Sequence, residues 1–320
     1  MSQDRVLIIG ANGQIGTALT NRLRAELGET AVVASDLRRP TTDTGPFELI
    51  DATDAARLAD VVRRYRITQI YHLAAVLSAR GESDPIWAWN LNMQTLLNVL
   101  EVARQAGLAK VFVPSSIAVF GESAPKLHTP QSACLDPTTV YGVSKVATEN
   151  WALYYHKRYG LDVRSLRYPG VISYETLPGG GTTDYAVAIF HEAVQGHDYN
   201  CFLTADTRLP MIYMEDALRA TLALMDAPAQ AISVRTSYNL AGLSVTPAEL
   251  TAAIQAYFPT FVTYYKPDFR QQIADSWPRT IDDAVARRDW NWQPAYDLPR
   301  LTDVMIANLT AVYGAAVVTA

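Results

Sequence analysis

The sequence predicts an α/β fold in which a doubly wound parallel sheet carries a smaller C-terminal lobe. Short apolar runs of strand length alternate with amphipathic segments of helical length through the first half of the chain. This alternation is typical of a parallel sheet that is covered by helices on both faces. The chain has 320 residues, of which 49% are hydrophobic, so it has enough apolar mass for one large core or two smaller ones.

The elements of the first half follow from these runs. The expected strands are Val6–Ile9, Val32–Ala34, Ile70–Leu73, Val111–Pro114 and Val163–Arg167. The expected helices are Ile15–Leu27, Ala55–Tyr65, Trp87–Gln105 and Ser144–Tyr159.

The alternation ends after Pro169. The second half is expected to contain a glycine-rich loop at Pro178–Gly181, a helix at Tyr185–Gln195, a sheet element at Leu209–Tyr213, and a segment, Ser237–Leu240, that returns to the main sheet. We therefore assign residues 1–172 and 209–242 to the main domain, and residues 173–208 and 243–320 to the smaller lobe.

Charge and composition exclude several classes of protein. The 27 Lys and Arg residues against 32 Asp and Glu give a formal charge of −5, which argues against a protein held on nucleic acid by positive charge. No apolar run is long enough to span a membrane, and no signal peptide is visible. The two cysteines, Cys134 and Cys201, and the five histidines lack the spacing of a metal site. We expect a cytoplasmic protein without a bound metal.

A glycine-rich loop directly after the first strand predicts dinucleotide binding. Gly10, Gly13 and Gly16 have GxxGxxG spacing and lead into a helix, whose first N–H groups and positive dipole end suit a diphosphate. Asp36 ends the next strand, where a carboxylate binds ribose hydroxyls and repels a 2′-phosphate, so NAD is favoured over NADP. Arg38 and Arg39 leave NADP as an alternative, because arginines here pair with a 2′-phosphate.

Further positions along the same sheet edge are expected to contact the dinucleotide. Asp51 follows the third strand-like segment and meets the adenine or, alternatively, caps the next helix. His72 ends a strand followed by small residues and is expected to be a packed core residue. The full set of predicted cofactor contacts is Gly10, Asn12, Gly13, Gln14, Ile15, Gly16, Asp36, Leu37, Asp51, Ala52, Leu73, Ala74, Ala75, Asn92, Tyr141, Lys145 and Tyr168.

Tyr141 and Lys145 form a candidate catalytic pair. At positions i and i+4 of a helix they share a face, so the ammonium is expected to lower the pKa of the phenol and make it a general base. The YxxxK pattern alone proves little, because it arises by chance at a rate of about 0.3 per chain of this composition. Ser116, which follows a strand, is expected to place a hydroxyl at the same sheet edge.

These motifs, in this order, resemble the extended short-chain dehydrogenase/reductase superfamily with its Rossmann fold. A second set of segments, Arg167–Gly170, the PGGGTTDYA segment from Pro178, and Leu209–Met214, resembles the short-chain family of L-threonine 3-dehydrogenases. The resemblance implies NAD-dependent oxidation of L-threonine at its β-carbon to L-2-amino-3-oxobutanoate.

The resemblance also implies roles for individual residues. Tyr141 would be the base, Lys145 would lower its pKa and hold the nicotinamide ribose, and Ser116 would bind the reacting oxygen. Asn92 would support the site or be a buried structural residue, and Tyr168 would lie against the nicotinamide end. The implied substrate contacts are Ser78, Ser116, Tyr141, Thr182, Thr183 and Trp277.

Several alternatives stay open at this stage. Thr182 and Thr183 are alternatively caps of the next helix, Ser78 the end of a turn, and Trp277 a core residue. A nucleotide-sugar 4-epimerase uses the same machinery, and a non-catalytic redox sensor would also bind the dinucleotide. By analogy with the superfamily we expect a homodimer that pairs the helices Trp87–Gln105 and Ser144–Tyr159. The three glycines at 179–181 are a candidate hinge for closing the smaller lobe over substrate.

Overall fold

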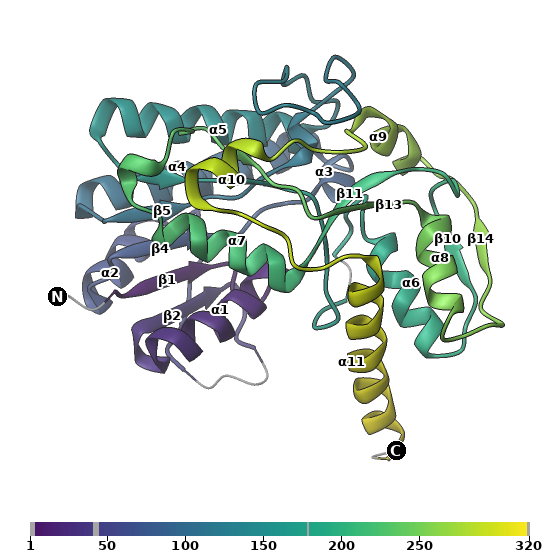
Figure 1. Cartoon of the computed structure of the whole chain (residues 1–320). Coiled ribbons are helices and arrows are strands. Elements are labelled where there is room, and N and C mark those ends of the chain that lie inside the picture. Colours follow the sequence, from purple (N-terminus) through teal and green to yellow (C-terminus); the bar gives the residue numbers. More distant parts are fainter. Residues whose placement is uncertain (1–3, 41–44, 178, 319–320) are drawn as a thin grey trace.

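The protein has a large α/β body and a smaller lobe built around the C-terminal helices (Figure 1). The computed structural model describes residues 4–40, 45–177 and 179–318, with side chains up to Gly314. Pro178 of the predicted glycine-rich loop lies outside the described residues.

The body is built on a parallel sheet whose described strands follow the order β3-β2-β1-β4-β5-β7. The strands are β1 (Val6–Ile9), β2 (Val32–Asp36), β3 (Phe47–Leu49), β4 (Gln69–His72), β5 (Lys110–Phe112) and β7 (Val163–Arg164). The order reverses between β1 and β4, and doubly wound sheets bind ligands beyond the strand ends at such a point. The predicted fold class is confirmed.

Helices cover both faces of this sheet. The helices on one face are α2 (Ala55–Tyr65), α4 (Pro85–Ala106) and α5 (Val140–Tyr159), and those on the other are α1 (Gln14–Leu27), α7 (Met214–Asp226) and α10 (Ala284–Trp290). Leu58, Leu96 and Ala152 share one buried cluster with Ile70 of the sheet. Leu19, Leu218 and Ala286 share another with Ile8. All four helices predicted in the first half exist, and α5 begins four residues earlier than predicted.

Small sheets extend the body where the sequence predicted simpler strands. The predicted strand Val163–Arg167 is divided: β7 joins the main sheet, whereas β8 (Leu166–Tyr168) pairs with β6 (Ser115–Ser116) and β12 (Tyr238–Asn239). The expectation that Ser237–Leu240 returns to the main sheet is therefore wrong. The division falls at Ser165, whose hydroxyl and carbonyl bind Ser237 and Tyr238, so the chain changes pairing partner there.

Another small sheet links the body to the lobe. The predicted element β11 (Leu209–Tyr213) pairs with β9 (Gly170–Ile172) and β13 (Leu243–Val245). The remaining elements are η1 (Glu29–Ala31), α3 (Ser78–Gly81), η2 (Ile117–Val119), α6 (Tyr185–Val194), β10 (Tyr199–Cys201), η3 (Ala229–Ala231), α8 (Pro247–Gln255), β14 (Thr263–Tyr265), α9 (Arg270–Ser276) and α11 (Leu298–Val318).

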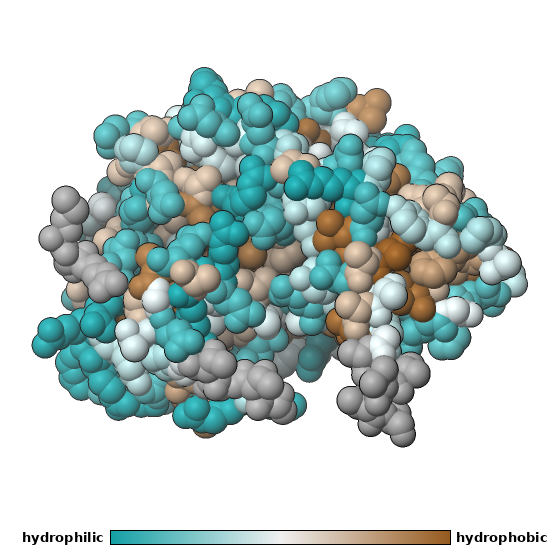
Figure 2. Space-filling view, turned by 60° about the horizontal axis from the view of Figure 1, so that its bottom comes forward, coloured by the Kyte–Doolittle hydropathy of each residue, from teal (hydrophilic) through white to brown (hydrophobic). Residues whose placement is uncertain are grey.

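The lobe has its own core, which gathers buried residues of α6, α8, α9 and α11. Part of the segment 243–320, which was predicted to belong to the lobe, packs against the body. Ala286, Trp290 and Trp292 lie in the core under α1 and α7. On the face in Figure 2, apolar side chains gather where α11 leaves the lobe, whereas most of the remaining surface is polar. In the described part of the chain no helix is long and apolar enough to cross a membrane.

Candidate active site

Two adjoining cavities lie beyond the carboxyl ends of the parallel strands. We call the first, about 250 Å³, the tyrosine cavity, because Tyr141 lines it together with Ser116 and Lys145. We call the second, about 470 Å³, the aspartate cavity, because Asp36 and Asp51 line it. Gly10 and Gly13 line both, so a dinucleotide that spans the glycine loop has room at each end.

The glycine loop is shaped for close approach. Gly10 has φ +87°, and a Cβ there would lie 2.7 Å from the backbone nitrogen of Ala74. A Cβ on Gly16 would lie 2.1 Å from the carbonyl oxygen of Gly10. Gly13 caps α1 without a side chain, so no side-chain group satisfies the first N–H groups of the helix. These donors fit a diphosphate.

Two carboxylates lie at the far end of the aspartate cavity. Asp36 accepts hydrogen bonds from the backbone N–H groups of Asn12 (3.0 Å) and Leu37 (2.7 Å), which fix it at the end of β2. Asp51 accepts from the backbone and hydroxyl of Thr53. The residue that caps α2 is Asp54, so the capping alternative for Asp51 is wrong.

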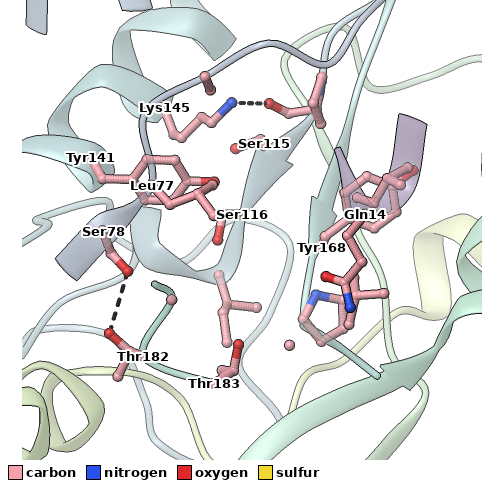
Figure 3. Close-up of a pocket in the computed structure, with 18 of the residues that line it drawn as sticks. Gln14, Leu77, Ser78, Ser115, Ser116, Tyr141, Lys145, Tyr168, Thr182 and Thr183 are labelled. Carbon is pink, nitrogen blue, oxygen red and sulfur yellow. Dashed lines mark hydrogen bonds between the residues drawn. The ribbon is translucent and has the colours of Figure 1, made fainter. Parts of the chain in front are cut away.

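The tyrosine cavity brings Tyr141, Lys145 and Ser116 together, as Figure 3 shows. Tyr141 and Lys145 lie in the first turns of α5, and Ser116 lies where β6 leads into η2. A Cβ on Gly142 would lie 2.2 Å from the carbonyl oxygen of Ala118, so this glycine allows α5 to approach the turn after Ser116. The side chain of Ser116 thereby faces the Tyr141 phenol.

The electrostatics of the pair differ from the prediction. Burial raises the pKa of Tyr141 to about 12, and its hydrogen bond with Ser116 offsets only part of this rise. Lys145 Nζ lies 5.5 Å from the centre of the Tyr141 ring and donates to the carbonyl of Pro114 at 2.7 Å. Burial lowers the pKa of Lys145 to about 8. Desolvation therefore decides the direction of the shift in the pKa of the phenol.

Two predicted neighbours of the cofactor, Asn92 and Tyr168, make contacts within the protein, and His72 was predicted to be a core residue. Asn92 holds the backbone of Val76 with its amide oxygen (2.8 Å) and nitrogen (3.2 Å), and it lines neither large cavity. The ring of Tyr168 lines the tyrosine cavity, but its hydroxyl pairs with Thr221. His72 is buried, and burial lowers its pKa to about 3, in agreement with a packed neutral imidazole.

The other predicted substrate residues also line the tyrosine cavity. Ser78 and Thr182 come from distant parts of the chain, yet their hydroxyl oxygens lie 3.3 Å apart. Thr183 and Trp277 line the same cavity. Neither threonine side chain caps α6, because Asp184 occupies the N-cap position.

Asp184 was missed by the sequence analysis. Its carboxylate accepts from the backbone N–H groups of Gly180 and Gly181 at 2.7 Å each, which ties the glycine loop to the start of α6. Among the described residues that line the tyrosine cavity, it is the one carboxylate. The GGGTTD order was visible in the sequence, but the place of the aspartate at the cavity depends on how the loop folds.

Comparison with known proteins identifies the family. The model described as the NAD dependent epimerase/dehydratase family matches residues 6–241. The chain belongs to this family. Its cofactor is NAD, and the cradle between Gly10, Gly16 and Ala74 fits that dinucleotide.

The names of similar proteins are more specific than the family name. A mitochondrial L-threonine 3-dehydrogenase of Bos taurus is 48% identical over 308 residues, which cover 95% of this chain and 82% of the relative. A solved structure of a GalE-like L-threonine dehydrogenase from Cupriavidus necator in its holo form is 56% identical and has a TM-score of 0.94. The match covers 95% of this chain and 99% of that structure. A solved structure of a monomeric L-threonine 3-dehydrogenase from a metagenome is 45% identical and has a TM-score of 0.94. The match covers 96% of this chain and 99% of that structure.

Proposed function

We propose that this protein is an NAD-dependent L-threonine 3-dehydrogenase, which oxidises L-threonine at its β-carbon to L-2-amino-3-oxobutanoate. The observation that carries the proposal is the tyrosine cavity, which is lined by a phenol, several hydroxyl groups and a carboxylate. The names of relatives at 45% to 56% identity support it. The epimerase alternative has less support from these relatives.

In the proposed reaction the chain supplies acid–base groups and orientation. Tyr141, as the phenolate, takes the proton of the threonine β-hydroxyl, and the Ser116 hydroxyl donates a hydrogen bond to the reacting oxygen. Lys145, anchored by the Pro114 carbonyl, stabilises the phenolate by its positive charge. NAD⁺, when bound, supplies the acceptor for the hydride that leaves the β-carbon. Gly10, Gly13, Gly16 and Asp36 hold the dinucleotide.

The remaining cavity residues suit a small zwitterion. The hydroxyls of Ser78, Thr182 and Thr183 offer hydrogen bonds to a carboxylate, while Asp184 offers a negative charge to an ammonium. Trp277, which is buried, forms the apolar wall. This division of roles favours an amino acid over an uncharged alcohol.

The function is tested by mixing the purified protein with NAD⁺ and following NADH absorbance. We expect turnover with L-threonine and much less with L-allo-threonine or L-serine. UDP-glucose is the control for the epimerase alternative, and its conversion to UDP-galactose is followed by chromatography, because epimerisation returns the hydride to the sugar and leaves no net NADH. Turnover of UDP-glucose without threonine oxidation would overturn the proposal, and NAD binding without oxidation of any alcohol would favour a redox sensor.

Replacing Asp184 with Asn is expected to raise KM for L-threonine by about tenfold or more, while the dissociation constant of NAD stays within about twofold. The amide keeps the size of the side chain but loses the charge that faces the ammonium. Steady-state kinetics and NAD titration measure the two quantities. Asp206→Asn is the matched control, since Asp206 is exposed and lines neither large cavity. An unchanged KM would remove Asp184 from the substrate site.

We also propose a cytoplasmic homodimer. Both cysteines are free thiols, and Cys134 is exposed, which suits a reducing compartment. Val143 and Tyr154 on α5, and Ile86 and Trp87 on α4, are large apolar residues with exposed side chains. The metagenome relative is described as monomeric, so the mass of this protein in solution decides between dimer and monomer.

The double variant Val143→Arg with Tyr154→Arg is expected to convert the dimer to a monomer, because two charges per protomer would enter an apolar interface. Light scattering after size exclusion measures the mass directly. Val312→Arg, which changes an exposed apolar residue of α11, is the matched control. A monomeric wild-type protein would refute the dimer outright.

A further inference from the structure

Glu149 is a buried carboxylate that the proposed reaction does not use. Tyr141, Lys145 and Glu149 follow one another at four-residue spacing on α5, so they share one face of the helix. Glu149 is only 1% exposed and does not line the tyrosine cavity. A charge this deep in the protein is costly unless it is paired and fully hydrogen-bonded.

The partners of Glu149 come from two strands next to the reaction site. Its Oε1 accepts from the hydroxyl of Ser115 at 2.6 Å and from Nε of Arg167 at 2.9 Å. Its Oε2 accepts from Nη2 of the same guanidinium at 2.8 Å. Arg167 is itself buried and also donates to Asn239 Oδ1 and to the carbonyl of Gln131. Every charged group in the cluster therefore has a partner.

The cluster joins the elements that carry the reaction residues. Ser115 pairs with Arg167 across β6 and β8, and the next pair along the same ladder is Ser116 with Tyr168. Since Ser115 gives its hydroxyl to Glu149, Ser116 is the serine left to face the phenol. Glu149 thus connects the helix of the base to the strand of the hydroxyl donor.

We propose that Glu149 is a positioning residue of this active site: through Ser115 and Arg167 it fixes β6 and β8 against α5, one turn from Lys145. The inference deepens the proposed function, since it rests on the roles assigned there to Ser116, Tyr141 and Lys145. Glu149 would act through the residues it holds, without touching substrate or cofactor.

A purely stabilising role explains this arrangement less well. Replacing a buried ion pair by apolar residues of similar volume is often neutral or stabilising, so a pair of buried charges is a poor way to gain stability alone. Bidentate hydrogen bonds fix direction as well as distance, and a misplacement of about 1 Å at a reacting group costs about a hundredfold in rate. Orientation is the property that this cluster supplies best.

The charge of Glu149 acts on Lys145 as well. The carboxylate raises the pKa of Lys145 and so opposes the burial that lowers it to about 8. The groups that face Lys145 from other elements are His72 of β4, which is neutral above a pKa of about 3, and the Pro114 carbonyl. On α5 itself the neighbours are Tyr141 and Glu149. Removing the carboxylate is therefore expected to lower the pKa of Lys145 further.

The test is Glu149→Gln in the NAD-loaded enzyme, read in two ways. We expect kcat for threonine to fall by about ten- to a hundredfold, with the NAD dissociation constant within about twofold. We also expect the lysine NMR signal that Lys145→Arg removes to titrate at lower pH than in wild type. The chain has five lysines, so this signal can be assigned. An unshifted signal, or an unchanged kcat, would overturn the proposal.

Two further variants separate positioning from stability. In the double variant Glu149→Met with Arg167→Met the buried charges are gone, and we expect a folded protein that is still slow. Recovery of wild-type kcat and lysine titration there would overturn the proposal, since the cluster would then only fill space. Ser115→Ala keeps the ion pair and is expected to lower kcat several-fold; a wild-type kcat in this variant would refute the link to Ser116.

The control is Asp162→Asn, which breaks a comparable pair with the buried Arg164 away from both cavities. We expect it to lower the melting temperature without moving the Lys145 titration. The lysine titration requires no threonine, so the role of Glu149 can be tested independently of the proposed threonine oxidation. An inactive wild type would refute the proposed function, and an unshifted lysine would refute the role of Glu149.

Discussion

Replacing Tyr141 with Phe is expected to lower kcat for threonine oxidation by about a thousandfold or more, with little change in NAD affinity. The substitution removes the phenol oxygen, which is the proposed proton acceptor, and keeps the ring that fills the cavity wall. The glycine loop and Asp36 are untouched, so the dissociation constant of NAD is expected to stay within about twofold. NADH absorbance gives kcat, and calorimetric titration gives the NAD affinity.

The pH dependence provides a second reading of the same variant. Burial places the pKa of Tyr141 at about 12, above the ordinary value, so the wild-type rate is expected to rise with pH as the phenolate fraction grows. The residual rate of Tyr141→Phe is expected to lack this rise. Tyr159→Phe is the matched control, because Tyr159 lies at the end of the same helix and is half exposed. Substantial turnover by Tyr141→Phe would require another base.

The parts of the site that the sequence predicted are those that local geometry determines. Gly10, Gly13 and Gly16 lie in one loop between a strand and a helix, and only that context is needed to expect a diphosphate cradle. Tyr141 and Lys145 share a helix face wherever the helix lies. Asp36 is at the carboxyl end of a strand beside the first one, so parallel pairing alone brings it to the same edge.

The parts that the sequence missed depend on contacts between distant segments. In the sequence Glu149 is an ordinary helical carboxylate. Its partners Ser115 and Arg167 are 34 and 18 residues away along the chain, and only the fold brings them into contact. The division of Val163–Arg167 into β7 and β8 is decided by pairing with Tyr238, which no apolar pattern within the segment reveals. The pKa of Tyr141 was misjudged because helix spacing predicts the neighbouring ammonium but not the depth of burial.

Replacing Gly16 with Ala is expected to weaken NAD binding by at least about a hundredfold and to lower the melting temperature by several degrees. The new Cβ would lie 2.1 Å from the Gly10 carbonyl oxygen and 2.8 Å from the Ala11 Cα, and both of these atoms belong to the backbone. Neither can rotate away, so the loop must move off the start of α1. Overpacking of this kind costs about 1 to 3 kcal/mol or more, and it displaces the N–H donors that face the diphosphate.

Gly314→Ala is the control for this prediction, because a Cβ there meets nothing within 4 Å and a helical backbone accepts alanine. NAD titration and thermal unfolding are measured for both variants, with and without the dinucleotide. The stabilisation that NAD gives to the wild type should be largely lost in Gly16→Ala, since a ligand stabilises only in proportion to its affinity. If Gly16→Ala bound NAD normally, the close contacts of Gly10 and Gly16 in this loop would not be required for NAD binding, and the prediction would be wrong.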